Sequence, residues 1–174
     1  MTLSESSPSL SLRKRLFKQA LDRLDYRVAV RDDAPALARL FKIFFDEAHY
    51  QDRGIVYDLD RATAWIAGVV QQGSCPHLVA VHAGAIVGAI SYSLDDTFCV
   101  EPVAVLHMLY VLKAQRKSAI GRVLLALAAE LAKGDGACAF HAPIASEMDE
   151  QQSLINLFGR GGFKPIGVIL GRRL

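Results

Sequence analysis

A short basic loop between an apolar strand and a helix has the composition of an anion site. Residues 116–122 read Arg-Lys-Ser-Ala-Ile-Gly-Arg and follow the almost uninterrupted apolar run of residues 103–112. Apolar residues then recur at helical spacing, namely Ile120, Val123, Leu124, Leu127 and Leu131. The first turn of a helix has free N–H groups and the positive end of the helix dipole, and arginines flank it here. This arrangement predicts an anion site, and a phosphate group is its natural ligand.

The spacing of this loop excludes two common phosphate-binding motifs. A Walker loop ends in Gly-Lys-Ser/Thr, and the dinucleotide fingerprint needs three spaced glycines. The segment has neither pattern, since Gly121 is its single glycine. The phosphate group is therefore expected to belong to a ligand other than those that these two motifs bind.

Composition narrows the compartment and the partners. The 174 residues suit one domain, and 20 basic against 18 acidic residues give no broad cationic field for nucleic acid. Three widely spaced cysteines, Cys75, Cys99 and Cys138, fit reduced thiols and a cytoplasmic location. Residues 62–94 contain no charged side chain, but the polar residues 71–77 interrupt them, so we expect a helix and a buried strand pair there and no membrane span.

Hydrophobic periodicity divides the chain into an extension and one α/β domain. Residues 1–25 are predicted as an N-terminal extension with a basic amphipathic helix over residues 10–24, and residues 26–174 as the domain. The domain begins with a strand at residues 27–30, a helix from Pro35 capped by Asp32 or Asp33, and a second helix opened by Asp58. Strands at 78–81 and 86–92, joined by a tight turn at 82–85, then precede the apolar strand, the helix after the basic loop and a fifth strand near 137–142.

These residues resemble the GNAT superfamily of N-acyltransferases. Leu109-Tyr110-Val111 followed by Arg116-x-x-Ala119-x-Gly121 is similar to its acyl-CoA motif, and residues 157–165, which contain Phe158 and Phe163, are similar to its C-terminal Leu-Tyr-x-x-x-Gly-Phe. The Arg-Lys-Ser loop and the final segment, Ile169-Leu170-Gly171-Arg172-Arg173-Leu174, look most like the small phage- or prophage-encoded type. The resemblance implies a mixed, mostly antiparallel sheet of six or seven strands, the last at residues 169–174, with helices on both faces and a splay between strands 4 and 5.

The resemblance also implies acetyl-CoA as co-substrate, with no metal. The pantetheine arm is expected to bind backbone groups at Leu109 and Val111 in the splay, and the pyrophosphate the amides of residues 116–121. Arg116 and Arg122 are side-chain candidates for that pyrophosphate. The complete predicted cofactor site is Leu109, Tyr110, Val111, Arg116, Lys117, Ser118, Ala119, Ile120, Gly121, Arg122 and Phe158.

His107 is the predicted general base. An imidazole titrates near pH 6.5, which suits proton abstraction from an amine at neutral pH, and alternation places it on the strand face of Leu109 and Val111. The alternative is a hydrogen-bonded core histidine, and Glu101 acting through water is the second candidate base. The resemblance places the acceptor beside residues 49–57, where His49, Tyr50 and Tyr57 are the predicted contacts.

Two positions depart from the family pattern. Ala119 replaces a glycine of the motif, which requires a negative φ there. Phe158 stands where many members have a tyrosine that protonates the departing thiolate, so either the thiolate leaves without a protein acid, or Tyr110, Ser118 or water replaces that group, or the domain is slow or inactive.

The predicted function is acetyl transfer from acetyl-CoA to a primary amine by direct attack, the amine being a small molecule or a protein group. Phe158 and the basic extension favour the alternative of a non-catalytic acyl-CoA-binding or interaction module. A structural α/β domain without CoA is the third interpretation. A homodimer is a further expectation.

Overall fold

The computed structural model describes residues 24–97, 100–144 and 151–167. The strands are β1 (Leu24–Val28), β2 (His77–His82), β3 (Ala85–Asp95), β4 (Val103–Val111) and β5 (Ala139–His141), and the helices are α2 (Ala34–Glu47), α3 (Leu59–Gln72), α4 (Ile120–Gly134) and α5 (Gln151–Arg160). One sheet contains the strands in sequence order, and only the β4–β5 pair is parallel. The predicted mixed α/β architecture is confirmed.

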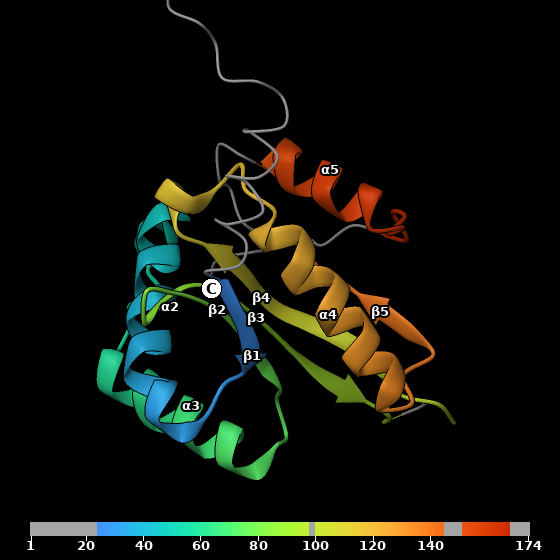
Figure 1. The fold of residues 1–174 in the computed structure, drawn as a ribbon, viewed down its shortest axis with the longest axis horizontal. Helices are drawn as coiled ribbons and strands as arrows, with labels where there is room; N and C mark the ends of the chain where they lie inside the picture. Colours follow the sequence, from blue (N-terminus) through green and yellow to red (C-terminus); the bar gives the residue numbers. More distant parts are fainter. Residues whose placement is uncertain (1–23, 98–99, 145–150, 168–174) are drawn as a thin grey trace, which may run out of the picture.

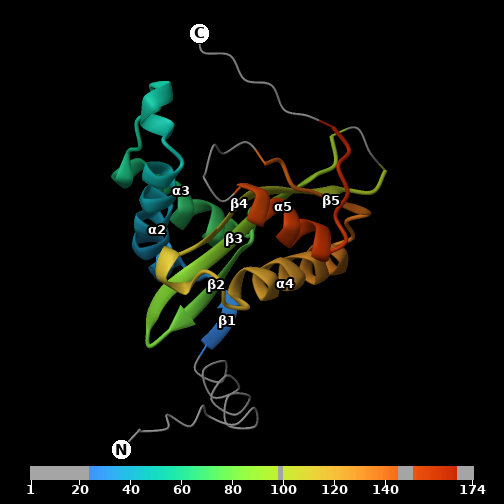
Figure 2. The same cartoon turned by 90° about the horizontal axis from the view of Figure 1, so that it is seen from above.

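The sheet separates two helical layers (Figure 1 and Figure 2). Residues of α2 and α3 pack with Val79 and Ala89 on one face, and residues of α4 and α5 pack with Ala80 and Tyr92 on the other. Because β2 and the middle of β3 are buried on both faces, the charge-free stretch of the sequence is explained by helix α3 and this hairpin. In the described residues, no helix is both long enough and apolar enough to span a membrane.

The number of strands differs from the expectation. The described residues form five strands, against the six or seven predicted, and the expected last strand at residues 169–174 lies outside them. The predicted extension also lies outside them up to residue 23, and β1 starts at Leu24, two residues before the predicted domain boundary at Tyr26.

Local signals explain most element boundaries. Asp58 caps α3 as predicted, since its carboxylate accepts the Arg61 N–H at 3.0 Å. The β2–β3 turn needs two residues with positive φ, and Ala83 and Gly84 have φ values of 50° and 80°. The connection at residues 82–85 is thus confirmed as a tight hairpin turn.

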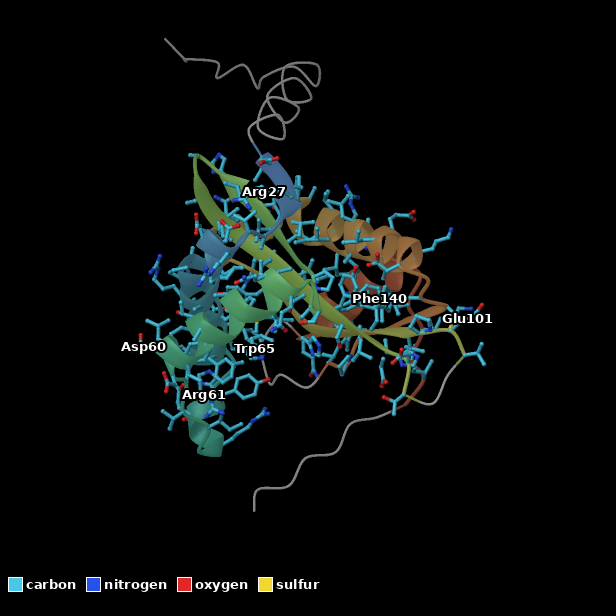
Figure 3. All side chains as sticks on the ribbon, turned by 90° about the horizontal axis from the view of Figure 1, so that it is seen from below. Arg27, Asp60, Arg61, Trp65, Glu101 and Phe140 are labelled. Atoms are coloured by element: carbon cyan, nitrogen blue, oxygen red, sulfur yellow. The ribbon has the colours of Figure 1, made fainter. Side chains whose placement is uncertain are left out.

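The predicted capping of α2 by Asp33 is wrong. Its carboxylate gives α2 no side-chain cap and instead accepts two hydrogen bonds from Arg27, at 2.6 and 3.0 Å, and one from the Val30 N–H. The Arg27 guanidinium is the main reason that the Asp33 pKa is lowered. The side chain therefore ties the end of β1 (Figure 3 labels Arg27) to the start of α2.

His77 makes the stability of the fold depend on pH. The side chain is 1% exposed between Phe41 and Trp65, its Nδ1 donates to the Cys75 carbonyl at 2.7 Å, and burial lowers its pKa below 6.5. The unfolded chain protonates this histidine first, so its contribution is full above about pH 6.5 and is lost as the pH falls toward the folded-state pKa. Urea unfolding should show a lower free energy of unfolding at pH 5.5 than at pH 7.5, and a smaller difference for His77→Gln. An equal difference in the variant would contradict this assignment.

Candidate functional site

The edge of β4 that faces β5 is open over most of its length. β5 pairs with β4 only from Val103 to Val105, although β4 continues to Val111. The Leu112 N–H donates to the Val87 carbonyl of β3, so by the alternation of an antiparallel ladder the N–H and C=O groups of Leu109 and Val111 point away from β3. The backbone at the two positions predicted to bind pantetheine therefore faces the open edge.

A cleft of about 400 Å³ lies beside this edge. Its walls are β4, the loop before α4, the first turn of α4 and one face of α5, with Leu109, Tyr110, Val111, Gln115, Arg116, Lys117, Ser118, Gly121, Arg122, Gln151, Ser153, Leu154, Asn156, Leu157 and Arg160 as lining residues. Eight of the eleven predicted cofactor-site residues belong to that set, and Ala119, Ile120 and Phe158 do not. The lining residues include arginines and a lysine but no aspartate or glutamate, which favours an anionic ligand.

The N-terminus of α4 leaves its amides available to a ligand. The residue before the helix is Ala119, so no side chain caps the helix, and the first turn contains no acidic residue. The first intrahelical bond of the turn is from the Val123 N–H to the Ala119 carbonyl. The N–H groups of Gly121 and Arg122 thus have no intrahelical acceptor and are free for an anion.

The backbone angles and contacts of residues 117–121 bear on which residue types fit in the loop and in the first turn of α4. Lys117 has a φ of 69°, and the Ser118 hydroxyl donates to the Gln115 carbonyl at 2.6 Å, which closes the turn before α4. Ala119 has a φ of −79°, the negative value that an alanine at this motif position requires. A Cβ at Gly121 would lie 3.4 Å from the Leu157 side chain, so the glycine lets α5 approach α4 closely.

Arg116 ties the loop before α4 to strand β4 and helix α2. Its Nε donates to the Val111 carbonyl at 3.0 Å, its guanidinium lies 5.2 Å from the centre of the Tyr110 ring, and one terminal nitrogen pairs with Glu47 at the end of α2. Glu47 and Tyr110 lie beside the charge, and Arg116 also lines the cleft, so the contact of its side chain with pyrophosphate stays a prediction. Arg122, which lines the cleft, keeps the predicted role open.

This ion pair should contribute measurably to stability. Arg116 and Glu47 side chains are only 17% and 26% exposed, so removal of one partner strands a poorly hydrated charge. We expect Glu47→Ala to lower the free energy of unfolding by about 2 kcal/mol. In a double-mutant cycle with Arg116→Met, followed by urea unfolding, the double variant should lose much less than the sum of the single losses. Additive losses would mean that the pair is energetically silent.

His107 lies on the opposite face of the sheet from the one predicted. The register passes from Ser91 opposite Met108 to Tyr92 opposite Leu106, so His107 is the extra residue of a β-bulge. Its Nε2 is 2.8 Å from the Ser93 Oγ, and Ser93 alternates with Tyr92, which faces α4. His107 is thus on the α2–α3 face, whereas Leu109 and Val111 pack on the α4 face.

The alternative of a core histidine is wrong, because His107 is exposed. Partial burial nevertheless lowers its pKa, so the imidazole is neutral at pH 7 and able to accept a proton. It lies two residues from Leu109, about 7 Å along the strand. His107 therefore lies at the inner end of the open edge of β4, with its side chain on the α2–α3 face of the sheet.

Glu101 is too far along the hairpin to act at the same place. It precedes β4, eight residues before Leu109, a distance of ~26 Å along an extended strand. Figure 3 places it at the outer end of the sheet, beyond Phe140. A single water molecule cannot bridge that distance, so the second candidate base is not supported by the geometry.

The three predicted acceptor residues have different surroundings. Tyr57 donates its hydroxyl to the Ala38 carbonyl at 2.8 Å and packs on Phe45, so it anchors residues 49–57 to α2. The ring of Tyr50 also packs on Phe45, with centroids 4.5 Å apart. His49 is exposed, has a φ of 54° and lies 3.7 Å from the Asp52 carboxylate. Of the three side chains, His49 is the one exposed to solvent.

Neither Phe158 nor Tyr110 supplies a ready proton donor for the thiolate leaving group. Phe158 is 4% exposed in the core between α4 and Phe163, outside the cleft lining. Tyr110 is buried, and burial together with the nearby Glu47 raises its pKa to about 12. Ser118 already donates to Gln115. Water in the open cleft is the remaining candidate among those predicted.

Sequence reasoning missed the α5 side of the cleft. Ser153, Asn156 and Arg160 line it from successive turns of α5. Their spacing of three and four residues puts them on one polar face of a helix, which is a signal that the sequence contained. Arg160 adds a cation to the cleft that the motif comparison did not assign.

Comparison with known proteins agrees with this architecture. The model of the acetyltransferase (GNAT) family matches residues 34–163, which span every described helix and strand except β1. The chain belongs to the GNAT acetyltransferase family. None of the curated proteins matches it in sequence.

Solved structures of GNAT-type acetyltransferases are similar in fold. The aminoglycoside N-acetyltransferase AAC(6')-Iy in complex with CoA has a TM-score of 0.71 at 15% identity, over 87% of this chain and 94% of that one. A possible acetyltransferase from Clostridium difficile 630 has a TM-score of 0.69 at 14% identity, over 86% and 95%. An aminoglycoside acetyltransferase from an uncultured soil metagenomic sample, in complex with sisomicin, has 0.66 at 17%, over 88% and 97%. Such low identities establish the fold alone.

Proposed function

We propose that this GNAT chain is an acetyl-CoA-dependent N-acetyltransferase that acetylates a primary amine by direct attack. The observation that carries the proposal is the continuity of the site. β4 has no β5 partner from Leu106 to Val111, so one stretch of strand contains His107, whose imidazole is exposed on the α2–α3 face, and the edge that leads to the basic N-terminus of α4. One end is suited to a pyrophosphate and the other to proton abstraction.

The residues fit acetyl-CoA by their donor chemistry. The amides of Gly121 and Arg122, with the side chains of Lys117 and Arg122, would hold the pyrophosphate. The outward backbone groups of Leu109 and the outward N–H of Val111 would hold the pantetheine amides as an added strand would, since the Val111 carbonyl already accepts from Arg116 Nε. When bound, acetyl-CoA supplies a thioester carbonyl and a thiolate leaving group.

The chain must make the amine nucleophilic. A free alkyl ammonium titrates near pH 10.4, as lysine does, so almost none of it is neutral at pH 7. His107 takes the proton, and an outward amide of β4 stabilises the negative charge on the carbonyl oxygen during attack. Binding the amine and acetyl-CoA side by side orients them for reaction, and this orientation supplies the rest of the rate enhancement.

Release of CoA thiol on addition of an amine tests the proposal. A panel should contain polyamines, aminoglycosides, arylalkylamines and lysine peptides, because GNAT structures of similar fold include complexes with an aminoglycoside. We expect acetyl-CoA-dependent thiol release with at least one class and an acetylated product of matching mass. Binding of acetyl-CoA without release on any amine would favour the second function below.

A non-catalytic acyl-CoA-binding module is the second candidate, favoured by Phe158. This buried side chain has no hydroxyl to protonate a thiolate, and Tyr110 is held beside Glu47. Such a module would bind acetyl-CoA through the same loop. Removal of the His107 imidazole would leave its affinity for acetyl-CoA unchanged.

Four narrower predictions rest on the sequence alone. They are a cytoplasmic location, a homodimer, the phage-encoded subtype and the choice between a small-molecule and a protein amine. Expression with a fluorescent tag, sedimentation analysis and the amine panel test three of them directly.

A further inference from the structure

The bulge in β4 brings His107 beside the neighbouring strand. The extra residue turns the imidazole toward the α2–α3 face, where β3 presents Ser91 and Ser93 on alternate positions. The Ser93 Oγ lies 2.8 Å from His107 Nε2, whereas Ser91 forms no hydrogen bond to the imidazole. Ser93 is the side chain that fixes the ring.

The two ring nitrogens of His107 have different surroundings. Nε2 meets Ser93, and within residues 24–97, 100–144 and 151–167 no hydrogen bond to Nδ1 is found. A hydroxyl can accept from Nε2–H or donate to an unprotonated Nε2. In the first case the basic lone pair is on Nδ1, and in the second the lone pair of Nε2 is occupied by Ser93.

We propose that Ser93 is a positioning residue, whose Oγ accepts the Nε2–H of His107 and so keeps the basic lone pair on Nδ1. The inference rests on the proposed function, because His107 acts as base only there. It follows the general rule that the hydrogen bond at one ring nitrogen decides the protonation of the other. The same contact favours the imidazolium, since its Nε2–H is a stronger donor to Oγ.

The proton transfer is balanced at this site. An N–H bond of the substrate ammonium breaks, an Nδ1–H bond forms on His107, and Nε2–H stays on its nitrogen and on Ser93. The neutral amine then forms the bond to the carbonyl carbon as the C–S bond breaks and the thiolate leaves. One of the two protons then left on the nitrogen goes to the thiolate, the other stays as the amide N–H of the product, and Nδ1 returns its proton to water.

Ser93→Ala tests the proposal, with Ser93→Thr as the variant that restores the hydroxyl and Ser91→Ala as the matched control. Nitrogen NMR of the ¹⁵N-labelled full chain reports the tautomer of His107 without any turnover. His77 is a titratable group that interacts electrostatically with His107, and its signals are assigned in the same spectrum through a His77→Gln variant. We expect an Nε2–H tautomer in the parent, in Ser93→Thr and in Ser91→Ala, and a mixture of tautomers in Ser93→Ala.

Kinetics on an active amine complete the test. Ser93→Ala should lower kcat about tenfold with unchanged affinity for acetyl-CoA, and the midpoint of the acid limb should move to lower pH. Ser93→Thr should recover most of kcat. A parent with an Nδ1–H tautomer, or a Ser93→Ala variant with the parent tautomer and kcat, would overturn the proposal. An Nε2–H tautomer in a parent that acetylates no amine would instead overturn the proposed function.

Discussion

His107→Ala is expected to lower kcat about 100-fold at pH 7 while the affinity for acetyl-CoA stays the same. General-base catalysis contributes about 10²–10⁴-fold, and the imidazole lies beyond the loop that would hold the pyrophosphate. The loss should therefore fall on turnover and leave donor binding intact. Stopped-flow thiol detection gives kcat, and calorimetry gives the affinity for acetyl-CoA.

The pH profile separates a lost base from a disturbed fold. Burial lowers the pKa of His107 below 6.5, so the neutral base persists above that pKa and the parent kcat/KM should fall only below pH 6.5. The limb should vanish in His107→Ala, which leaves the ionisation of the amine itself. His82→Ala, at the end of β2, is the matched control and should keep the parent profile. An unchanged kcat in His107→Ala would return His107 to a structural role.

Ala119→Asp is expected to weaken acetyl-CoA binding about 100-fold without unfolding the chain. An aspartate at the N-cap accepts hydrogen bonds from the first-turn amides, which belong here to Gly121 and Arg122. It would occupy the donors proposed for the pyrophosphate and add a like charge. The same cap should raise the stability of α4 by about 1 kcal/mol, so stability and binding should change in opposite directions.

Two variants separate the charge from the cap. Ala119→Asn caps the helix without a charge and should weaken binding less than Ala119→Asp. Ala114→Asp adds the same charge on an exposed residue outside the cleft lining and should bind as the parent does. Thermal unfolding and calorimetry on the same samples give both quantities. Parent affinity in Ala119→Asp would show that the α4 terminus holds no phosphate.

Much of the fold follows from local signals in the sequence. The Asp58 cap, the Ala83–Gly84 turn and the apolar run of β4 each depend on residues that are adjacent in the chain. Sequence periodicity is sufficient for such elements because their hydrogen bonds are local. The order of strands and helices could be predicted for this reason.

Several features of the site depend on partners that are distant in sequence. Strict alternation puts His107 with Leu109, but the bulge arises from pairing with β3, which alternation in one strand cannot reveal. The Arg116 side chain meets Glu47, 69 residues earlier, a contact that the motif around Arg116 does not indicate. Asp33 accepts hydrogen bonds from Arg27, six residues earlier, and does not cap α2 as predicted.

Calorimetric titration of acetyl-CoA into the full chain tests the central claim most directly. An N-acetyltransferase and a non-catalytic acyl-CoA-binding module would both hold acetyl-CoA at the β4 edge and the α4 N-terminus. A structural α/β domain without CoA would not. We predict one site per chain, with a dissociation constant between about 1 µM and 1 mM, the usual range for enzyme substrates, and competition by free CoA. No detectable binding at millimolar acetyl-CoA, by a chain with an intact thermal transition, would contradict the account.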